Sequence, residues 1–134
     1  MRLVLDASVA IASMRPAEPE HAAARARVER ALRGADELVE PSIFGVEVAG
    51  ALARRGTTEQ DIRDLVQALR RPPHQIVTIG PKGAAAAETR AIQARLRGAD
   101  ALYVWLASAR GLTLCTLDQE MAQRGGAFCM VIAP

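Results

Sequence analysis

Four acidic side chains are unusual because each one lies in an apolar stretch of the sequence. They are Asp6, Glu47, Asp100 and Asp118. Glu47 is the only charge between residues 43 and 52, and its helical neighbours Ile43, Gly50 and Ala51 cannot form a salt bridge with it. Burying an unpaired carboxylate costs several kcal/mol, and acids brought together raise one another's pKa. A hard divalent cation such as Mg²⁺ or Mn²⁺ removes both penalties, so the pattern predicts that all four acids bind a metal.

Each acid also has a simpler interpretation. Asp6 could cap the helix that follows it, Asp100 could be an acid favoured at a helix start, and Glu47 could be a solvated gap in an apolar face. Asp118 could follow a capping box formed by Thr116 and Gln119. The hydroxyls of Ser8 and Thr116 could orient a carboxylate or serve as helix caps. The two histidines, His21 and His74, are distant from the acids in the pattern and are expected at the surface.

The elements that position these acids alternate between strands and helices. The expected strands span residues 2–5, 37–39, 75–79, 112–116 and 128–132, and the expected helices 8–14, 21–33, 42–55, 57–71, 81–96, 100–110 and 118–124. Alternation of this kind predicts a three-layer α/β sandwich, with a parallel sheet of four or five strands flanked by helices, in a single domain over residues 1–134. Strand 2–5 is expected at the centre. Asp6 and Asp118 then lie at the carboxyl edge of the sheet, where ligands bind in open α/β folds.

Composition excludes several classes of protein. Half of the 134 residues are apolar, so the chain is not disordered, and no apolar run is long enough to span a bilayer. Asp6 interrupts the N-terminal apolar run, so we expect no signal peptide and a cytoplasmic location. Cys115 and Cys129 are expected to be core residues in neighbouring strands, without a disulfide or a zinc site.

The charge distribution suggests a polyanionic partner. Net charge is only +2, but if four of the 15 acids serve one site, 17 bases face 15 − 4 = 11 remaining acids. All bases except Lys82 are arginine, whose planar guanidinium suits phosphate, although a bias in nucleotide composition would give the same richness. The candidates for contacting the phosphates of such a partner are Arg15, Arg54, Arg55 and Arg97.

The acidic segments together carry a family resemblance. The chain resembles the PIN-domain nucleases, and in particular the VapC toxins of type II toxin–antitoxin systems. The matching pieces are Leu3-Val4-Leu5-Asp6-Ala7-Ser8, Pro41 followed by Glu47-Val48, Ala99-Asp100-Ala101 and Leu114-Cys115-Thr116-Leu117-Asp118. They occur in order over the whole chain.

The resemblance implies a Mg²⁺- or Mn²⁺-dependent endoribonuclease with Asp6, Glu47, Asp100 and Asp118 as its acidic quartet and Thr116 as the accompanying hydroxyl. It also implies a homodimer inhibited by a small VapB-like antitoxin. Two alternatives share these residues: a housekeeping RNA-processing nuclease of the same fold, and a non-catalytic module that binds metal or phosphate. A receiver domain is disfavoured because strand 75–79 offers no phosphoacceptor aspartate and Lys82 is wrongly placed.

Overall fold

The computed structural model describes residues 1–134 and contains one five-stranded parallel sheet in the order β3-β2-β1-β4-β5. The strands are β1 (Arg2–Leu5), β2 (Glu37–Pro41), β3 (Gln75–Val77), β4 (Thr113–Cys115) and β5 (Val131–Ile132). β1 is central, as its apolar run predicts, and Leu3, Val4 and Leu5 are fully buried. Leu5 pairs with Cys115, so β1 and β4 end at the same edge of the sheet.

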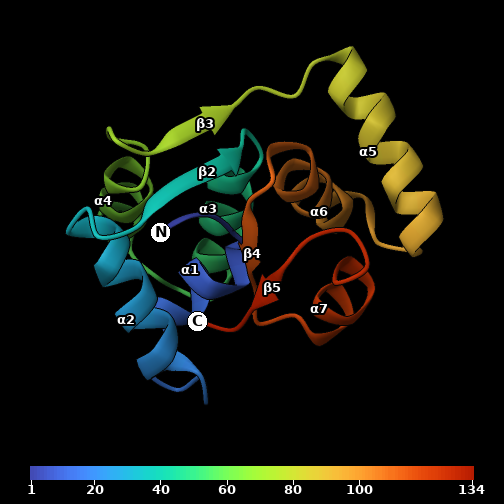
Figure 1. The fold of residues 1–134 in the computed structure, drawn as a ribbon. Helices are drawn as coiled ribbons and strands as arrows, with labels where there is room; N and C mark the ends of the chain where they lie inside the picture. The colour runs from blue at the N-terminus through green and yellow to red at the C-terminus, as the bar shows by residue number, and fades with distance from the viewer.

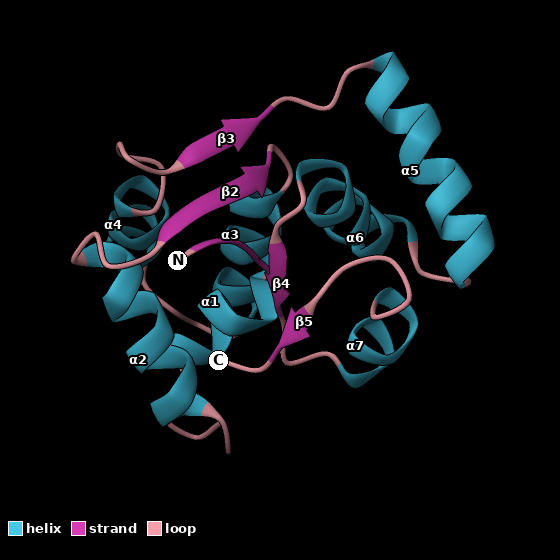
Figure 2. Ribbon diagram, in the orientation of Figure 1, coloured by secondary structure: helices cyan, strands magenta, loops and turns pink.

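Seven helices cover the sheet in two layers, which confirms the three-layer α/β sandwich (Figure 1). They are α1 (Ala7–Ser13), α2 (His21–Leu32), α3 (Phe44–Arg54), α4 (Glu59–Ala68), α5 (Pro81–Ala94), α6 (Gly98–Arg110) and α7 (Gln119–Gly125). α1 packs against α2 and α3, and α3 against α4; α6 packs against α5 and α7. The sheet lies between these two groups, as Figure 2 shows in magenta and cyan. None of the helices combines the length and the apolar character needed to cross a membrane.

The hydrophobic core is one cluster of 29 buried residues. Helix α6 packs against β1, β2 and β4, and its residues Tyr103, Val104 and Leu106 are fully buried. Helix α3 buries Val48 and Leu52. The two helices that carry Glu47 and Asp100 are therefore fixed by their apolar faces, while their first turns lie near the carboxyl edge of β1.

Several helix ends differ from the expected positions. Helix α3 begins at Phe44, two residues after the expected start, with Ile43 as its N-cap, and Glu47 lies in its first turn. Helix α4 begins at Glu59, also two residues late, and its N-cap is Thr58, whose hydroxyl accepts the Asp61 N–H at 3.3 Å. Helix α6 begins at Gly98, so Asp100 lies in its first turn and does not open it.

The expected helix 81–96 ends two residues early. Helix α5 ends at Ala94, and Arg95 adopts a left-handed conformation with φ of 53°. A left-handed residue ends a helix because its carbonyl no longer points along the axis. The turn places Arg97 in extended conformation at the N-cap of α6.

The expectation that His74 is a surface residue was wrong. His74 is only 8% exposed, and its Nδ1 accepts the Leu38 N–H at 3.2 Å. The chain entering β3 lies beside β2, so the imidazole satisfies a backbone donor there. His21 is partly buried and donates from Nδ1 to the Ala12 carbonyl at 2.8 Å. Neither histidine is near the acids.

The two cysteines are free, as expected, but only one lies in a strand. Cys115 is buried in β4, and burial raises the pKa of its thiol to about 11. Cys129 is partly buried and precedes β5. A protonated, buried thiol is unreactive, so Cys115 serves packing.

Candidate active site

Asp6 forms the floor of the site at the end of the central strand. It is the N-cap residue of α1, but its side chain makes no cap hydrogen bond. Its Oδ2 instead accepts hydrogen bonds from the Ser8 hydroxyl and from the Thr116 hydroxyl, the latter at 2.9 Å. Burial raises the pKa of Asp6, and the two hydroxyl donors partly offset that rise. Both hydroxyls thus orient a carboxylate.

Glu47 enters the site from α3, in the layer opposite to α6. Its Oε1 accepts a hydrogen bond of 2.6 Å from the Tyr103 hydroxyl of α6. Burial raises the pKa of Glu47, the Tyr103 hydroxyl lowers it, and the nearby charges of Asp6 and Asp100 raise it further. Glu47 is therefore part of a cluster of like charges and is not a solvated gap in an apolar face.

Asp100 and Asp118 form the rim of the site and share one arginine. Arg97 donates from Nε to Asp100 Oδ2 at 3.2 Å and from Nη2 to Asp118 Oδ2 at 3.0 Å. Burial raises the pKa of Asp100, while the Arg97 charge lowers it. Asp118 is also the N-cap of α7, because its Oδ1 accepts the Met121 N–H at 2.9 Å. The cap is thus Asp118 itself, and Thr116 accepts the Asp118 N–H at 3.0 Å.

These acids line a single cleft of about 410 Å³ at the carboxyl edge of the sheet. The lining residues are Asp6, Ala7, Ser8, Ile11, Val46, Glu47, Gly50, Ala51, Arg54, Arg97, Ala99, Asp100 and Asp118. All four predicted site acids are among them, although they come from four separate segments. Ser8 lines the cleft, and Thr116 is buried just behind Asp6. Of the candidate arginines, Arg54 and Arg97 line the cleft and Arg15 and Arg55 do not.

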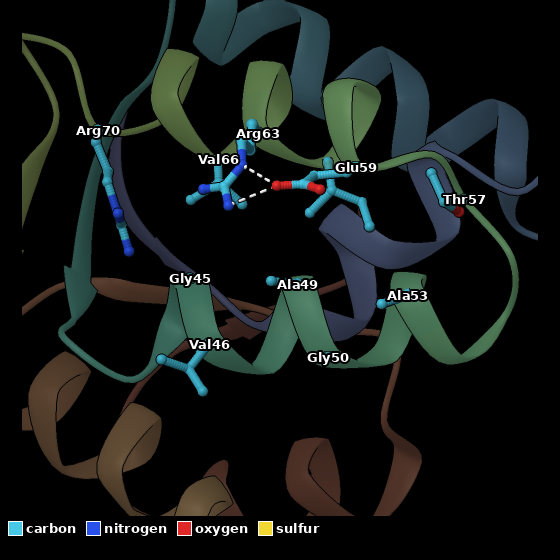
Figure 3. Close-up of a pocket in the computed structure, with 11 residues that line it drawn as sticks. Gly45, Val46, Ala49, Gly50, Ala53, Thr57, Glu59, Arg63, Val66 and Arg70 are labelled. Atoms are coloured by element: carbon cyan, nitrogen blue, oxygen red, sulfur yellow. Dashed lines mark hydrogen bonds and ion pairs between the residues drawn. The ribbon is translucent and has the colours of Figure 1, made fainter.

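A larger hollow of about 670 Å³ lies on the other side of α3, between α3 and α4. Figure 3 shows its small residues on α3, including Gly45, Ala49 and Ala53, facing α4. Its one acid, Glu59, is paired with Arg63 at 2.7 Å. This hollow therefore lacks the cluster of carboxylates that lines the smaller cleft.

The donor set of the cleft suits a hard divalent cation, because four carboxylates supply only oxygen ligands. In the present side-chain arrangement no three acidic, histidine or cysteine side chains converge into a ready metal site. The carboxylates instead accept hydrogen bonds from protein donors: hydroxyls bind Asp6 and Glu47, and Arg97 binds Asp100 and Asp118. The residues fit a metal by chemistry and by their common cleft.

Two residues of the site went unrecognised in the sequence. Tyr103 follows Asp100 by three residues, and that helical spacing was the only available signal of a side chain on the same face. Glu40 is fully buried beside the site: its Oε1 accepts the Leu5 N–H at 2.7 Å, and its Oε2 has no partner. Burial raises the pKa of Glu40 well above its ordinary value. The signal that could have identified Glu40 is the position of an acid between the apolar residues Val39 and Pro41.

Comparison with known proteins identifies the family. The family model described as the PIN domain matches residues 3–127, so the chain belongs to the PIN domain family. A comparison with curated protein sequences gives no significant match.

Solved structures share the fold at low sequence identity. The chain is similar to VapBC2 from Rickettsia felis, solved bound to a DNA fragment from its promoter (TM-score 0.70, 12% identity, covering 99% of this chain and 98% of that one). It is similar to a toxin–antitoxin complex from Klebsiella pneumoniae, with a TM-score of 0.65 and 16% identity over 97% of this chain and 95% of that one. It is also similar to FitAcB from Neisseria gonorrhoeae, with a TM-score of 0.65 and 19% identity over 98% of this chain and 96% of that one.

Proposed function

We propose that this PIN-domain protein is a Mg²⁺- or Mn²⁺-dependent endoribonuclease that acts as the toxin of a toxin–antitoxin pair. The observation that carries the nuclease proposal is the convergence of Asp6, Glu47, Asp100 and Asp118 on one cleft. The similarity to VapBC2 and to the Klebsiella pneumoniae toxin–antitoxin complex supports the toxin role. The proposal includes a cytoplasmic site of action, a homodimer and inhibition by a small VapB-like antitoxin.

The reaction is hydrolysis of an RNA phosphodiester. A bound cation would supply Lewis acidity, lowering the pKa of water and stabilising charge on the phosphate. Asp6 and Asp100 are the proposed direct ligands, and Asp118 and Glu47 complete the set or orient the attacking water. Ser8 and Thr116 fix the position of the Asp6 carboxylate, and Tyr103 fixes that of Glu47.

The decisive variant is Asp6→Asn. The amide oxygen can still accept hydrogen bonds from Ser8 and Thr116, so the fold should persist, whereas one negative ligand is lost. We expect wild-type protein to cleave RNA with Mn²⁺ and to melt at a higher temperature when Mn²⁺ is added, because a ligand that binds only the native state stabilises it. Asp6→Asn should do neither. Cleavage by this variant at the wild-type rate would refute the assignment.

The toxin role needs its own experiment. Expression of the wild-type chain should arrest growth, and co-expression of a neighbouring open reading frame should relieve the arrest. Asp6→Asn should be harmless at equal expression. Wild-type protein that cleaves RNA in vitro yet is tolerated without any partner would instead indicate a housekeeping RNA-processing nuclease.

A further inference from the structure

Arg97 lies across the mouth of the acidic cleft. It is the N-cap residue of α6, and its side chain is 72% exposed, whereas those of Asp100 and Asp118 are 15% and 25% exposed. The guanidinium therefore reaches the two carboxylates from the solvent side. Arg54, the other arginine of the cleft lining, has no carboxylate within ion-pair distance. Arg97 is the cation that offsets the charge of the rim.

Arg97 occupies one oxygen of each rim carboxylate. It donates to Oδ2 of Asp100 and to Oδ2 of Asp118, one hydrogen bond to each. The second oxygen of Asp118 is already engaged in capping α7. A cation entering the rim therefore competes with Arg97 for Asp118 Oδ2. An arginine stays protonated in proteins, so only movement of its side chain can release the two acids.

Moving Arg97 away from the rim costs the arginine little free energy, but the two carboxylates that it leaves need another cation. An exposed guanidinium that swings away returns to water at little cost, because exposed ion pairs are worth little. The partly buried carboxylates left behind would repel each other and Asp6 unless another cation replaced the guanidinium. A divalent metal ion can replace the guanidinium and carries twice its charge. Arg97 would then remain at the mouth of the cleft, where an RNA phosphate must lie.

We propose that Arg97 is a built-in counter-ion of the rim: it competes with the divalent cation for Asp100 and Asp118 and, once displaced, donates to a phosphate of the bound RNA. This inference rests on the proposed metal-dependent nuclease function. It gives Arg97 two opposed effects, weakening metal binding and strengthening RNA binding. A residue with a merely structural role would move neither quantity, or would move both in the same direction.

The experiment measures two affinities. Calorimetry gives the affinity for Mn²⁺. A separate assay gives the affinity for single-stranded RNA, with Ca²⁺ in place of Mn²⁺ so that the RNA is not cleaved. The variants are Arg97→Gln, Arg97→Lys and, as a charge-matched control, Arg71→Gln, an exposed arginine outside the cleft. We expect Arg97→Gln to bind Mn²⁺ about tenfold more tightly, a gain of about 1.4 kcal/mol, and RNA several-fold more weakly. Arg97→Lys should bind Mn²⁺ with the wild-type affinity, and Arg71→Gln should match wild type in both assays.

The outcomes separate this inference from the function on which it rests. If neither wild type nor any variant binds Mn²⁺, the proposed function fails and the inference with it. If wild type binds Mn²⁺ and Asp6→Asn does not, the function stands. In that case, Arg97→Gln binding Mn²⁺ with unchanged or weaker affinity overturns the role of Arg97 alone. Binding of Mn²⁺ by Arg97→Gln but not by wild type would support the competition between Arg97 and the metal, and would contradict the metal dependence proposed for the wild-type protein.

Discussion

Tyr103 donates a hydrogen bond of 2.6 Å to Glu47, although 56 residues separate the two in the chain. Tyr103 is fully buried on α6, and Glu47 belongs to α3 in the opposite layer. The bond links the two helix layers across the carboxyl edge of the sheet. It also fixes one carboxylate of the cleft in a position set by the core.

Removing that hydroxyl should change the pH dependence of the proposed RNA cleavage. The Tyr103 hydrogen bond lowers the pKa of Glu47, so Tyr103→Phe should raise it. We expect the acid limb of the pH–rate profile to move to higher pH, with a loss of stability of about 1.5–3 kcal/mol for a hydrogen bond to a charged group. The profile of kcat/KM with Mn²⁺ tests this. An unchanged acid limb in a folded variant would show that Glu47 ionisation does not govern activity.

Thr116 should be sensitive to loss of its hydroxyl but tolerant of loss of its methyl group. The hydroxyl donates to Asp6 and accepts the Asp118 N–H, so Thr116→Val leaves both groups without this partner. Thr116→Val should cost about 1–3 kcal/mol of stability and reduce cleavage, because the buried Asp6 carboxylate keeps only the Ser8 hydroxyl and the partly buried Asp118 N–H loses its acceptor. Thr116→Ser, which keeps the hydroxyl, is the matched control. Chemical denaturation and cleavage rates of both variants measure the difference, and equal behaviour would contradict it.

Glu40 should make the protein less stable as pH rises. Burial raises its folded pKa well above the value of 4.5 expected when unfolded, so between those two values the folded state binds more protons. Stability then falls by at most about 1.4 kcal/mol per pH unit from this group. Glu40→Gln keeps an oxygen for the Leu5 N–H and cannot ionise.

The difference between the two proteins isolates the contribution of Glu40. Free energies of unfolding from urea titrations at several pH values should converge near pH 4 and diverge above it, with Glu40→Gln the more stable. If the free energies of unfolding of the two proteins differed by the same amount at every pH, ionisation of Glu40 would not affect stability and the prediction would be wrong.

Asp36 should have the opposite pH dependence. Its buried carboxylate accepts hydrogen bonds from Arg30 at 2.8 and 2.9 Å, from Arg27 at 3.0 Å and from the amino group of Met1 at 2.8 Å. The Arg30 hydrogen bond is the main cause that holds the pKa of Asp36 well below 3.8. Its contribution is therefore present above about pH 4 and is lost as pH falls towards the folded pKa.

Asp36→Ala tests this contribution. It leaves Arg27, which is partly buried, without its partner, and should cost about 3 kcal/mol at neutral pH. Thermal melts at pH 7 and pH 3 should show a gap between wild type and variant that narrows in acid. A difference in melting temperature that is larger at pH 3 than at pH 7 would contradict the stabilising role of the Asp36 carboxylate.

The local sequence of this protein determined its elements and their layering. The apolar run Leu3–Leu5, followed at once by Asp6, specifies a buried strand that ends on an acid, and alternation of strands and helices specifies a parallel sheet. Those signals depend on neighbours in the chain, such as hydrophobic periodicity and turn residues. Helix ends were less predictable, because Thr57 and Thr58 both suit a cap and only packing of the helix selects one.

Only the tertiary structure decided what each acid contacts. Sequence placed Asp6 and Asp118 at one edge. Tyr103 reaches Glu47 between helices of the two layers, Glu40 accepts from Leu5 on the neighbouring strand, and Arg97 reaches Asp118 on the next helix, 21 residues away. His74 was misjudged for the same reason, since the backbone N–H that its imidazole accepts belongs to Leu38, 36 residues away. Charge in an apolar stretch marks where a site lies. The hydrogen bonds from Thr116 to Asp6, from Tyr103 to Glu47 and from Arg97 to Asp118 arise from long-range packing, which no local pattern encodes.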